Sequence, residues 1–378
     1  MKKYMRHILF CLSLIILGLT PIKAQNFSVT GTVINAETGA AVEFANIGVE
    51  GTYLGTASDL NGNFEIILSQ AIIDKFVSVS AVGYKAKRFS VKDWEGQEGL
   101  IIQLAPTNYG ISEVNVAAKS KVGYGIIKTA SNLISENYTS KPFTLSAYFL
   151  NSKSGVKKEA LVKISDNKGY GERSFTESFQ NRNFKIVQNN VTKEALLLKD
   201  GLTLTEELIN ADIVRSPGNI LSIETINEFD VNEEDDEVID GEKVWVISYK
   251  CKNPSIQNTG DAECIAYSGT IFIAQDNNAI IKNTIKVVRQ GKFRHGVNFS
   301  NPEETKEELK YDIETSYKLN EGKYIIHSIK LNQEYKGVKE AAWLKVVDIL
   351  PLDKSITSRQ YFNNTKKDAD FWNSFKRP

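Results

Sequence analysis

The residues of this chain that could do chemistry are few, and the most conspicuous of them are acidic. Seven carboxylates fall in one short stretch, at Asp230, Glu233, Glu234, Asp235, Asp236, Glu237 and Asp240. Carboxylates at this density could hold a cation. Closely spaced like charges must otherwise be exposed or neutralised, and exposure costs less. We therefore interpret the run as a solvated loop that leads into a turn at Asp240-Gly241.

A second candidate is a spacing that begins like a calcium-binding loop. Asp59, Asn61 and Asn63 have the required separation. However, the sixth position of such a loop needs glycine and the twelfth an acid, and these positions hold Phe64 and Gln70. The spacing therefore predicts a hairpin turn that the Asp59 side chain caps.

Histidine chemistry has little support in the sequence. Beyond the first residues the chain has only His295 and His327, and neither has a metal-ligand partner four residues on or a nearby cysteine. The sequence also contains no H-E-x-x-H, G-x-S-x-G or phosphate-loop motif. We therefore predict that the protein is not an enzyme and that it uses no metal or cofactor. Side chains distant in sequence could still converge in space.

Two cysteines lie at the ends of two strand-like runs. Cys251 and Cys264 flank a polar loop that contains Pro254 and Gly260. In an oxidising compartment a disulfide here would close the loop and contribute about 3 kcal/mol. The alternative is a pair of unpaired, part-buried thiols.

Residues 1–24 predict export. Lys2, Lys3 and Arg6 precede an apolar run that Pro21 breaks, and Ala24 offers a small residue for cleavage. We expect a cleaved signal peptide and a location in the periplasm or at the outer membrane. The chain has 46 basic and 46 acidic residues, so its charge does not favour nucleic acid as a partner. No later segment is apolar for the roughly 20 residues that a membrane span needs.

Short apolar strands separated by turn residues fill residues 25–105. Thr38-Gly39 and Asn61-Gly62 supply tight turns, and Phe64, Ile66 and Leu68 share one side of a strand. Seven short strands in about 80 residues predict a two-sheet β-sandwich. The expected strands are 27–34, 44–49, 52–57, 63–68, 76–82, 84–91 and 100–104.

This stretch resembles the carboxypeptidase-regulatory-like domain, a transthyretin-like β-sandwich. The residues that carry the resemblance are Gly31-Thr32-Val33, Thr38-Gly39, Ala45-Asn46-Ile47, Gly51-Thr52, Gly55-Thr56, Asp59, Asn61-Gly62-Asn63-Phe64 and the run from Val79 to Tyr84. The resemblance implies a module without catalysis of its own. Similar modules precede the plug of many TonB-dependent outer-membrane receptors, and residues 111–120 resemble the linker that follows them there. We therefore predict a linker at residues 106–120. A receptor barrel of about 22 strands does not fit in the remaining residues.

Residues 121–378 predict a second, β-rich domain. Apolar residues recur with a helical period at Val122, Ile126, Ile127, Ala130, Leu133 and Ile134. A second helical stretch is expected at 205–214. Long strands are expected at 158–165, 243–251, 267–274, 280–289, 308–319, 323–334 and 342–350, with an extended run from Pro142. The predicted fold is mainly β: the sandwich, then a curved antiparallel sheet or half-barrel with one or two helices. The stretch from Gly269 to Val287 resembles a strand pair of periplasmic lipoprotein-carrier half-barrels.

We therefore predict a non-catalytic envelope protein whose curved domain binds an apolar ligand, a glycan or a partner protein in its concavity. The candidate lining residues are Trp245, Phe272, Tyr324 and Trp343, which could equally be plain core. One alternative is a hydrolase of envelope polymers with a site in the second domain. The other is a purely structural spacer with a filled interior.

Overall fold

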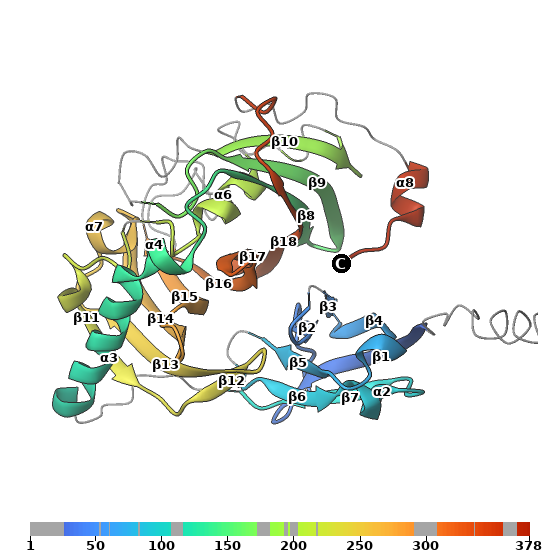
Figure 1. Cartoon of the computed structure of the whole chain (residues 1–378), viewed down its shortest axis with the longest axis horizontal. Coiled ribbons are helices and arrows are strands. Elements are labelled where there is room, and N and C mark those ends of the chain that lie inside the picture. Colours follow the sequence, from blue (N-terminus) through green and yellow to red (C-terminus); the bar gives the residue numbers. More distant parts are fainter. Residues whose placement is uncertain are drawn as a thin grey trace, which may run out of the picture.

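The chain folds into a small β-sandwich and a large curved sheet that lie side by side (Figure 1). This computed structural model describes residues 26–357 and 369–378, apart from 53, 60, 82–83, 107–115, 172–181, 193–195, 197–202, 217, 291–307 and 336. The predicted signal peptide, most of the predicted linker and His295 lie outside the described residues. No helix among the described residues is long and apolar enough to span a membrane.

The sandwich consists of a three-stranded and a four-stranded sheet around one core. The first sheet has the order β4-β1-β7 and the second β3-β2-β5-β6. The strands are β1 (Asn26–Asn35), β2 (Asn46–Val49), β3 (Gly55–Ala57), β4 (Asn63–Ser69), β5 (Phe76–Ser80), β6 (Lys87–Ser90) and β7 (Leu100–Leu104), with the short helix α2 (Val91–Trp94) after β6. Phe64, Ile66 and Leu68 point into the core as their alternation predicts.

The turn before β4 is the side-chain-capped turn that the sequence predicts. Asp59 Oδ1 accepts hydrogen bonds from the backbone N–H groups of Asn61, at 2.8 Å, and Asn63, at 2.9 Å. Gly62 has a φ of +78°, which favours glycine.

The second unit is built on one antiparallel sheet of very long strands. Its order is β10-β9-β8-β18-β17-β16-β15-β14-β13-β11, and β12 pairs with β13. The strands are β8 (Phe143–Lys153), β9 (Val156–Asp166), β10 (Arg182–Asn189), β11 (Phe229–Glu233), β12 (Glu237–Ile239), β13 (Glu242–Cys251), β14 (Cys264–Ala274), β15 (Ile280–Gln290), β16 (Glu308–Asn320), β17 (Lys323–Tyr335) and β18 (Val338–Pro351). The predicted mainly-β fold with a curved sheet is confirmed.

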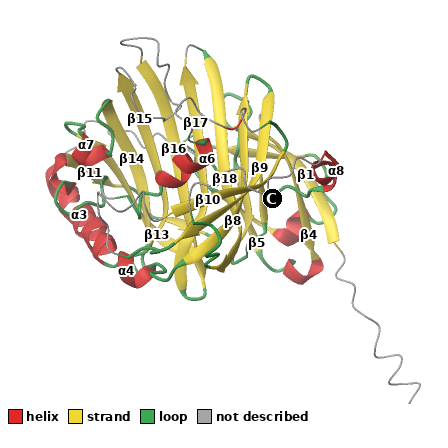
Figure 2. Cartoon of the chain, turned by 90° about the horizontal axis from the view of Figure 1, so that it is seen from above, coloured by secondary structure: helices red, strands yellow, loops and turns green. Residues whose placement is uncertain are grey.

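One face of this sheet carries the main apolar core, and helices lie along its side (Figure 2). The helices α3 (Val116–Asn132), α4 (Ile134–Asn137) and α6 (Leu204–Asn210) contribute Ile127, Ala130, Ile134, Leu208 and Ile209 to this core. The apolar helix face that the sequence predicts is therefore confirmed at the core positions of α3 and α4. Val122 is the exception, since it is 55% exposed.

The acidic run does not form one solvated loop. Part of it lies in β11 and β12, and Glu234 accepts a hydrogen bond from Ser248 of β13 at 2.6 Å. The expected turn does follow, since Asp240 and Gly241 have φ values of +51° and +86°. The seven carboxylates are all half-buried or exposed, so none of these charges has to be buried when β11 and β12 pair with β13.

Gly269 of β14 marks a place where the big sheet has no room for a side chain. A Cβ atom there would overlap the Thr284 carbonyl oxygen and the Tyr249 ring. We expect Gly269→Ala to lower the free energy of unfolding by about 1–3 kcal/mol because the clash forces neighbouring strands apart. The measurement is urea unfolding followed by circular dichroism.

Gly125→Ala is the matched control for this prediction. Gly125 lies in α3, and a Cβ atom there would meet nothing within 4 Å. We expect this substitution to stabilise the helix by about 0.5–1 kcal/mol. Equal effects of the two substitutions would contradict the steric argument.

Candidate functional site

The sandwich docks on the face of the large sheet that is opposite to the main core, and this contact is the junction. Two lysines of the sheet donate hydrogen bonds to backbone carbonyls of the sandwich. Lys330 Nζ of β17 lies 2.6 Å from the Phe44 oxygen, and Lys318 Nζ of β16 lies 3.0 Å from the Thr52 oxygen. Cavities remain on both sides of these contacts, because a twisted sheet and a small sandwich meet over a limited area.

The larger cavity, which we call the junction cleft, has a volume of about 1010 Å³. Its walls come from β3 and β4 of the sandwich and from β8 and β18 of the sheet, together with the last residues of the chain. Apolar side chains such as Leu54, Leu150 and Trp343 share this lining with hydroxyl groups such as that of Thr56. The lining therefore suits a ligand that has both apolar and polar parts.

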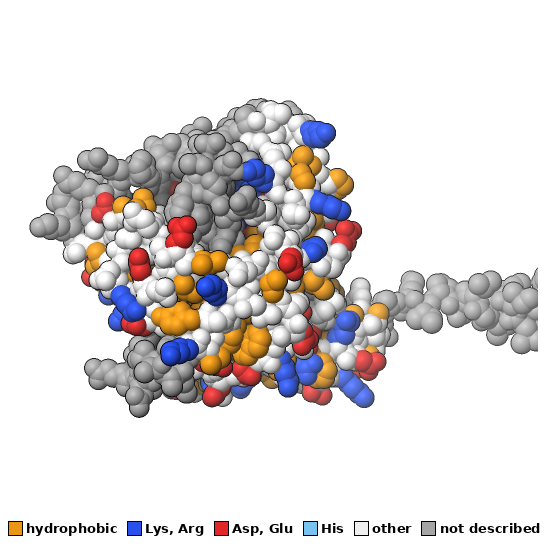
Figure 3. Space-filling model, turned by 60° about the vertical axis from the view of Figure 1, so that its left-hand side comes forward, with side chains coloured by type: hydrophobic (Ala, Val, Ile, Leu, Met, Phe, Trp, Pro, Cys, Tyr) orange, Lys and Arg blue, Asp and Glu red, His pale blue; other side chains and the backbone are white. Residues whose placement is uncertain are grey.

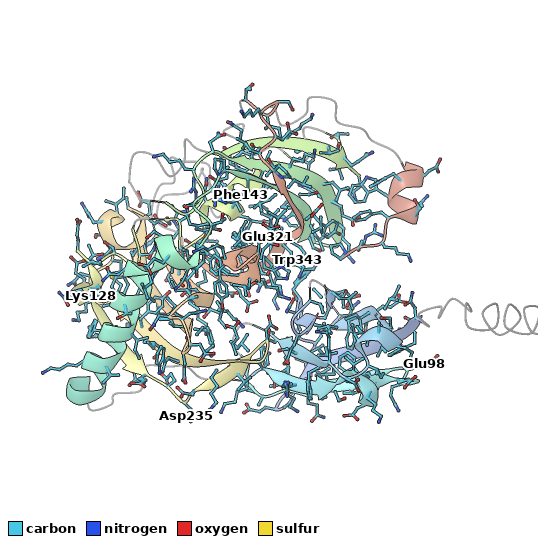
Figure 4. The ribbon with its side chains drawn as sticks, viewed as in Figure 1. Glu98, Lys128, Phe143, Asp235, Glu321 and Trp343 are labelled. Atoms are coloured by element: carbon cyan, nitrogen blue, oxygen red, sulfur yellow. The ribbon has the colours of Figure 1, made fainter. Side chains whose placement is uncertain are left out.

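Trp343 is the aromatic centre of one wall of the cleft, on the side of the sheet that faces the sandwich (Figure 4). Its ring makes an edge contact with Tyr148, with the centroids 6.2 Å apart. Trp343 is only 3% exposed, yet its indole Nε1 has no hydrogen-bond partner among the described residues. A buried donor without a partner is costly, so a ligand acceptor at this point would be stabilising.

The C-terminal segment closes one end of the aromatic wall. Helix α8 (Ala369–Ser374) is followed by Phe375, which stacks on Tyr148 at a centroid distance of 5.8 Å. Arg377 then forms two hydrogen bonds with the Glu159 carboxylate, at 2.6 and 3.0 Å. This ion pair fixes a segment far along the chain against β9.

A smaller cavity of about 300 Å³ lies at the other side of the junction. Its lining includes Tyr324, Lys318 and His327 of the sheet and the hydroxyl groups of Thr52, Ser78 and Ser80 of the sandwich. The Tyr324 hydroxyl donates to the Glu242 carboxylate, at 3.0 Å from Oε2. Burial raises the pKa of Glu242, although the bond from Tyr324 opposes this change.

Between the two cavities the sheet carries an unusual set of buried charges. Glu314 of β16 pairs with Lys282 at 2.9 Å and lies 3.9 Å from Lys330. Burial lowers the pKa of Lys330 to about 8, although Glu314 favours its charged form. With this pKa the Lys330 amine is still mainly protonated at pH 7 and loses its proton over the next two pH units.

The most unusual members of this set are Lys345 of β18 and His327 of β17. Both are 3% exposed, and Lys345 Nζ lies 2.6 Å from His327 Nε2. Burial and the neighbouring lysines hold the pKa of each group well below its ordinary value. Two basic groups can share one hydrogen bond only when at least one of them is neutral.

A bulge in β17 brings these two side chains together. Ser316 pairs with Ser328 and Tyr317 with Ile326, so His327 is the extra residue of the bulge. A bulge of this kind re-aims a side chain. His327 thereby reaches Lys345 beside the junction.

The structure does not gather the sequence-predicted lining residues into one site. Trp343 lines the junction cleft and Tyr324 the smaller cavity. Trp245 is partly buried against the main core. The ring of Phe272 is buried, with Lys282 Nζ 5.3 Å from its centroid. Neither Trp245 nor Phe272 lines either of these two cavities.

Cys251 and Cys264 are both free and buried in the structure, which is the second of the two alternatives that the sequence left open. Burial raises the pKa of Cys251, and burial together with nearby Asp261 raises that of Cys264 to about 12. Thiols in this state are poor nucleophiles.

Sequence reasoning missed Lys345 and Lys330 and found little support for a chemical role of His327. One signal was available: Lys330 follows "YIIHSI" and Lys345 follows "AAWL", so each lysine interrupts an apolar run. A lysine is rarely fully buried unless it has a partner.

No group of three or more metal-ligating side chains occurs within the described ranges. Acidic and basic side chains are interspersed on the face in Figure 3.

Comparison with known proteins identifies the first module. Residues 29–116 match the model of the CarboxypepD_reg-like domain, which confirms the predicted resemblance. The TonB-dependent receptor P3 of Formosa agariphila is 26% identical over 206 residues, which cover 53% of this chain. The matched region is 19% of the receptor, so this chain corresponds to about a fifth of that relative.

Two solved structures align with part of this chain at low identity and low TM-score. One is a domain from Vibrio parahaemolyticus assigned to outer membrane lipoprotein sorting, with a TM-score of 0.33 and 10% identity; the match covers 61% of this chain and 92% of that domain. The other is a DUF1329 family protein from Desulfovibrio piger, with a TM-score of 0.30 and 12% identity over 61% of this chain and 93% of that protein.

Proposed function

We propose that this chain is a non-catalytic binding protein of the bacterial envelope that holds an amphipathic, glycan-bearing ligand in the junction cleft. The observation that carries the proposal is the cleft itself. It has a volume of about 1010 Å³, and two separately built units line it. Ligand sites occur preferentially at such boundaries between units.

The chemistry of the lining supports an amphipathic ligand. Trp343 and Leu150 offer apolar surface, and the Trp343 indole N–H is available to a ligand oxygen. Thr56 and other hydroxyl-bearing residues of the sandwich face the same space. Aromatic rings with nearby polar groups suit the apolar faces and hydroxyl edges of sugars.

An envelope location is supported by the predicted export signal and by the module at residues 29–116. The relative from Formosa agariphila is a TonB-dependent receptor. In this proposal the sandwich forms one wall of the binding site and does more than separate other domains.

The test is isothermal titration calorimetry of the protein without residues 1–24. The probe is n-dodecyl maltoside below its micelle concentration, which joins a neutral glycan head to an alkyl tail. We expect saturable 1:1 binding, and Trp343→Phe should weaken it about tenfold by removing the indole donor and part of the ring.

Trp245→Phe is the matched control, because Trp245 lies outside the cleft. We expect it to bind the probe like the unaltered protein. Absence of saturable binding, or an equal loss in the two variants, would refute the cleft as the binding site. Release of maltose or dodecanol from the probe would instead favour a hydrolase.

A further inference from the structure

A third cavity borders the contact between Phe44 and Lys330. We call it the polar cleft, because most of the sheet residues that line it are charged or polar. Its volume of about 870 Å³ lies within the range of about 300–1,000 Å³ that is usual for small-ligand sites. Phe44 lines both this cleft and the junction cleft, and its carbonyl accepts the hydrogen bond from Lys330. The polar cleft is therefore a space of its own beside this contact.

The floor of the polar cleft is one row of side chains that crosses four strands of the large sheet. Each member of the row pairs with the next, in the order Ser268 (β14), Lys286 (β15), Asp312 (β16) and Asn332 (β17). The neighbours of Asp312 along β16, Tyr311 and Ile313, pack on the main core at the other face. Side chains directly opposite on neighbouring strands lie about 4.5–5.5 Å apart at Cβ. The row therefore presents four polar groups that one ligand can reach.

Asp312 and Asn332 form the centre of this floor. The Asn332 amide donates a hydrogen bond to Asp312 Oδ2 at 3.0 Å. Both residues are half-buried, because the sandwich lies over this polar part of the sheet. A carboxylate can accept at both oxygens, and an amide has a second N–H donor and an acceptor oxygen. The pair therefore has hydrogen-bonding capacity beyond its own bond.

The charges around the polar cleft balance within the protein. Burial raises the pKa of Asp312 to about 6, although the bond from Asn332 and the positive charge of Lys286 directly across from it favour the ionised form. Asp312 is therefore mainly an ionised acceptor at pH 7. At the rim, Lys310 pairs with Glu308 at 3.0 Å. A ligand of this cleft does not need a net charge of its own.

The wall opposite this floor comes from the sandwich and offers a different surface. It consists of residues 41–44 together with Ala81 and Tyr84. Tyr84 is half-buried, and its hydroxyl accepts a hydrogen bond from the Asn35 amide at 3.2 Å, which holds the ring in place. A ligand in the polar cleft would lie between a mainly apolar wall with an aromatic ring and a floor of donors and acceptors.

We propose that the polar cleft is a second binding site and that its ligand is an uncharged saccharide. A hydroxyl group both donates and accepts, so neighbouring sugar hydroxyls can donate to Asp312 and accept from Asn332 or Lys286. The apolar face of a sugar ring suits the wall that carries Tyr84. An alkyl chain would leave the polar groups of the floor without partners. The inference goes beyond the proposed function, since no residue of this floor lines the junction cleft.

The test is saturation-transfer difference NMR on the same protein preparation as in the calorimetric test. The probes are cellotriose, mannotriose and chitotriose, which are neutral trisaccharides of different stereochemistry. We expect saturable binding of at least one of them. Asp312→Ala and Asn332→Ala should each weaken that binding about tenfold, because each removes a hydrogen-bonding partner of the sugar. The two substitutions lie on different strands, which protects the test if one variant folds poorly.

Asp236→Ala is the matched control. Asp236 also accepts a hydrogen bond from a side-chain amide, that of Gln275 at 2.7 Å, but it lines none of the three cavities. This variant should bind the trisaccharide like the unaltered protein. Absence of saturable binding of all three sugars, or an equal loss in Asp236→Ala and Asp312→Ala, would overturn the site. Binding of the zwitterion glycylglycine in place of the sugars would also overturn it.

Crossed variants separate this inference from the proposed function. Trp343→Phe should weaken the binding of dodecyl maltoside and leave trisaccharide binding unchanged, whereas Asp312→Ala should do the reverse. If a trisaccharide binds through Asp312 and dodecyl maltoside does not bind, the polar cleft stands and the proposed function is wrong. If dodecyl maltoside binds through Trp343 and no trisaccharide binds, the second site is wrong and the proposed function stands. Trisaccharide binding that depends on Trp343 in place of Asp312 would also show that the second site is wrong.

Discussion

Replacing Asp166 by asparagine should destabilise the protein by about 3–5 kcal/mol, because it unbalances a buried ionic network. Asp166 is fully buried, and its carboxylate lies 2.8 Å from Arg182 Nε and 3.1 Å from an Arg215 nitrogen. The same carboxylate accepts backbone hydrogen bonds from Lys168 and Gly169. Asparagine keeps the shape of the side chain but leaves two buried guanidinium groups with Asp212 as their counter-charge.

The network explains why this loss cannot be repaired locally. Burial disfavours the charge of Arg182, but Asp166 and Asp212 outweigh that effect and raise the pKa of Arg182. Burial lowers the pKa of Arg215, and the nearby charge of Arg182 adds to this effect. Without the Asp166 carboxylate, the buried guanidinium of Arg215 is therefore the least favourable charge of this network. The double variant Asp166→Asn/Arg215→Met should recover part of the lost stability.

The measurement is urea unfolding of each variant. Asp230→Asn is the control, since the Asp230 side chain is 44% exposed and lies 3.5 Å from Lys252. Removal of this surface pair should cost less than about 1 kcal/mol. A loss at Asp166 no larger than that at Asp230 would show that the buried network does not hold the fold.

Replacing Tyr138 by alanine should cost about 3–5 kcal/mol, since it empties the centre of an aromatic cluster. Tyr138 directly follows α4 and is fully buried. Its ring lies 5.2 Å from that of Tyr170 and 5.5 Å from that of Tyr317 between centroids. Its hydroxyl donates to the carbonyl of Ile280 in β15. The side chain thus connects the end of the helical segment to the sheet.

Tyr138→Phe separates packing from hydrogen bonding. It keeps the ring and leaves the Ile280 carbonyl without this donor, so we expect a loss of about 1–3 kcal/mol. Thermal unfolding followed by calorimetry gives both values. If alanine and phenylalanine were equally tolerated, the ring would not be part of the supporting core.

Local patterns predicted the elements well because each depends on neighbours in sequence. The β14–β15 hairpin agrees with the strands expected at 267–274 and 280–289, and the turn between them contains Asn278 with a φ of +59°. The sandwich follows from spaced turn glycines and one-sided apolar strands. The helical period of Ile127, Ala130 and Ile134 correctly marks a buried face.

Long-range pairing was beyond such patterns. β8 pairs with β18 across nearly two hundred residues of sequence, from Phe143 opposite Pro351 to Lys153 opposite Glu340. No local sequence pattern specifies β18 as the partner of β8, because every strand offers the same backbone N–H and C=O groups for pairing. β10, β11 and β12 were not predicted, since their residues are mixed in polarity.

The candidate site, too, could be predicted from the sequence only in part. The sequence predicted that Trp343 and Tyr324 were candidates for a binding surface, but it placed that surface in the concavity of the sheet. The described cavities that these two residues line lie at the junction with the sandwich. The alternation of apolar and polar residues along a strand predicts which side chains are buried, but it does not predict which part of the protein packs over them.

By itself, the sequence determined the β-rich composition, the sandwich module and the positions of most strands, because periodicity and turn chemistry act over a few residues. Only the tertiary structure decided that Lys345 meets His327, because a bulge in β17 and the register of β17 with β18 set that contact. The burial that neutralises these groups also comes from a separate unit docked above them. Such an environment is a property of the assembled chain and cannot be read from any one segment.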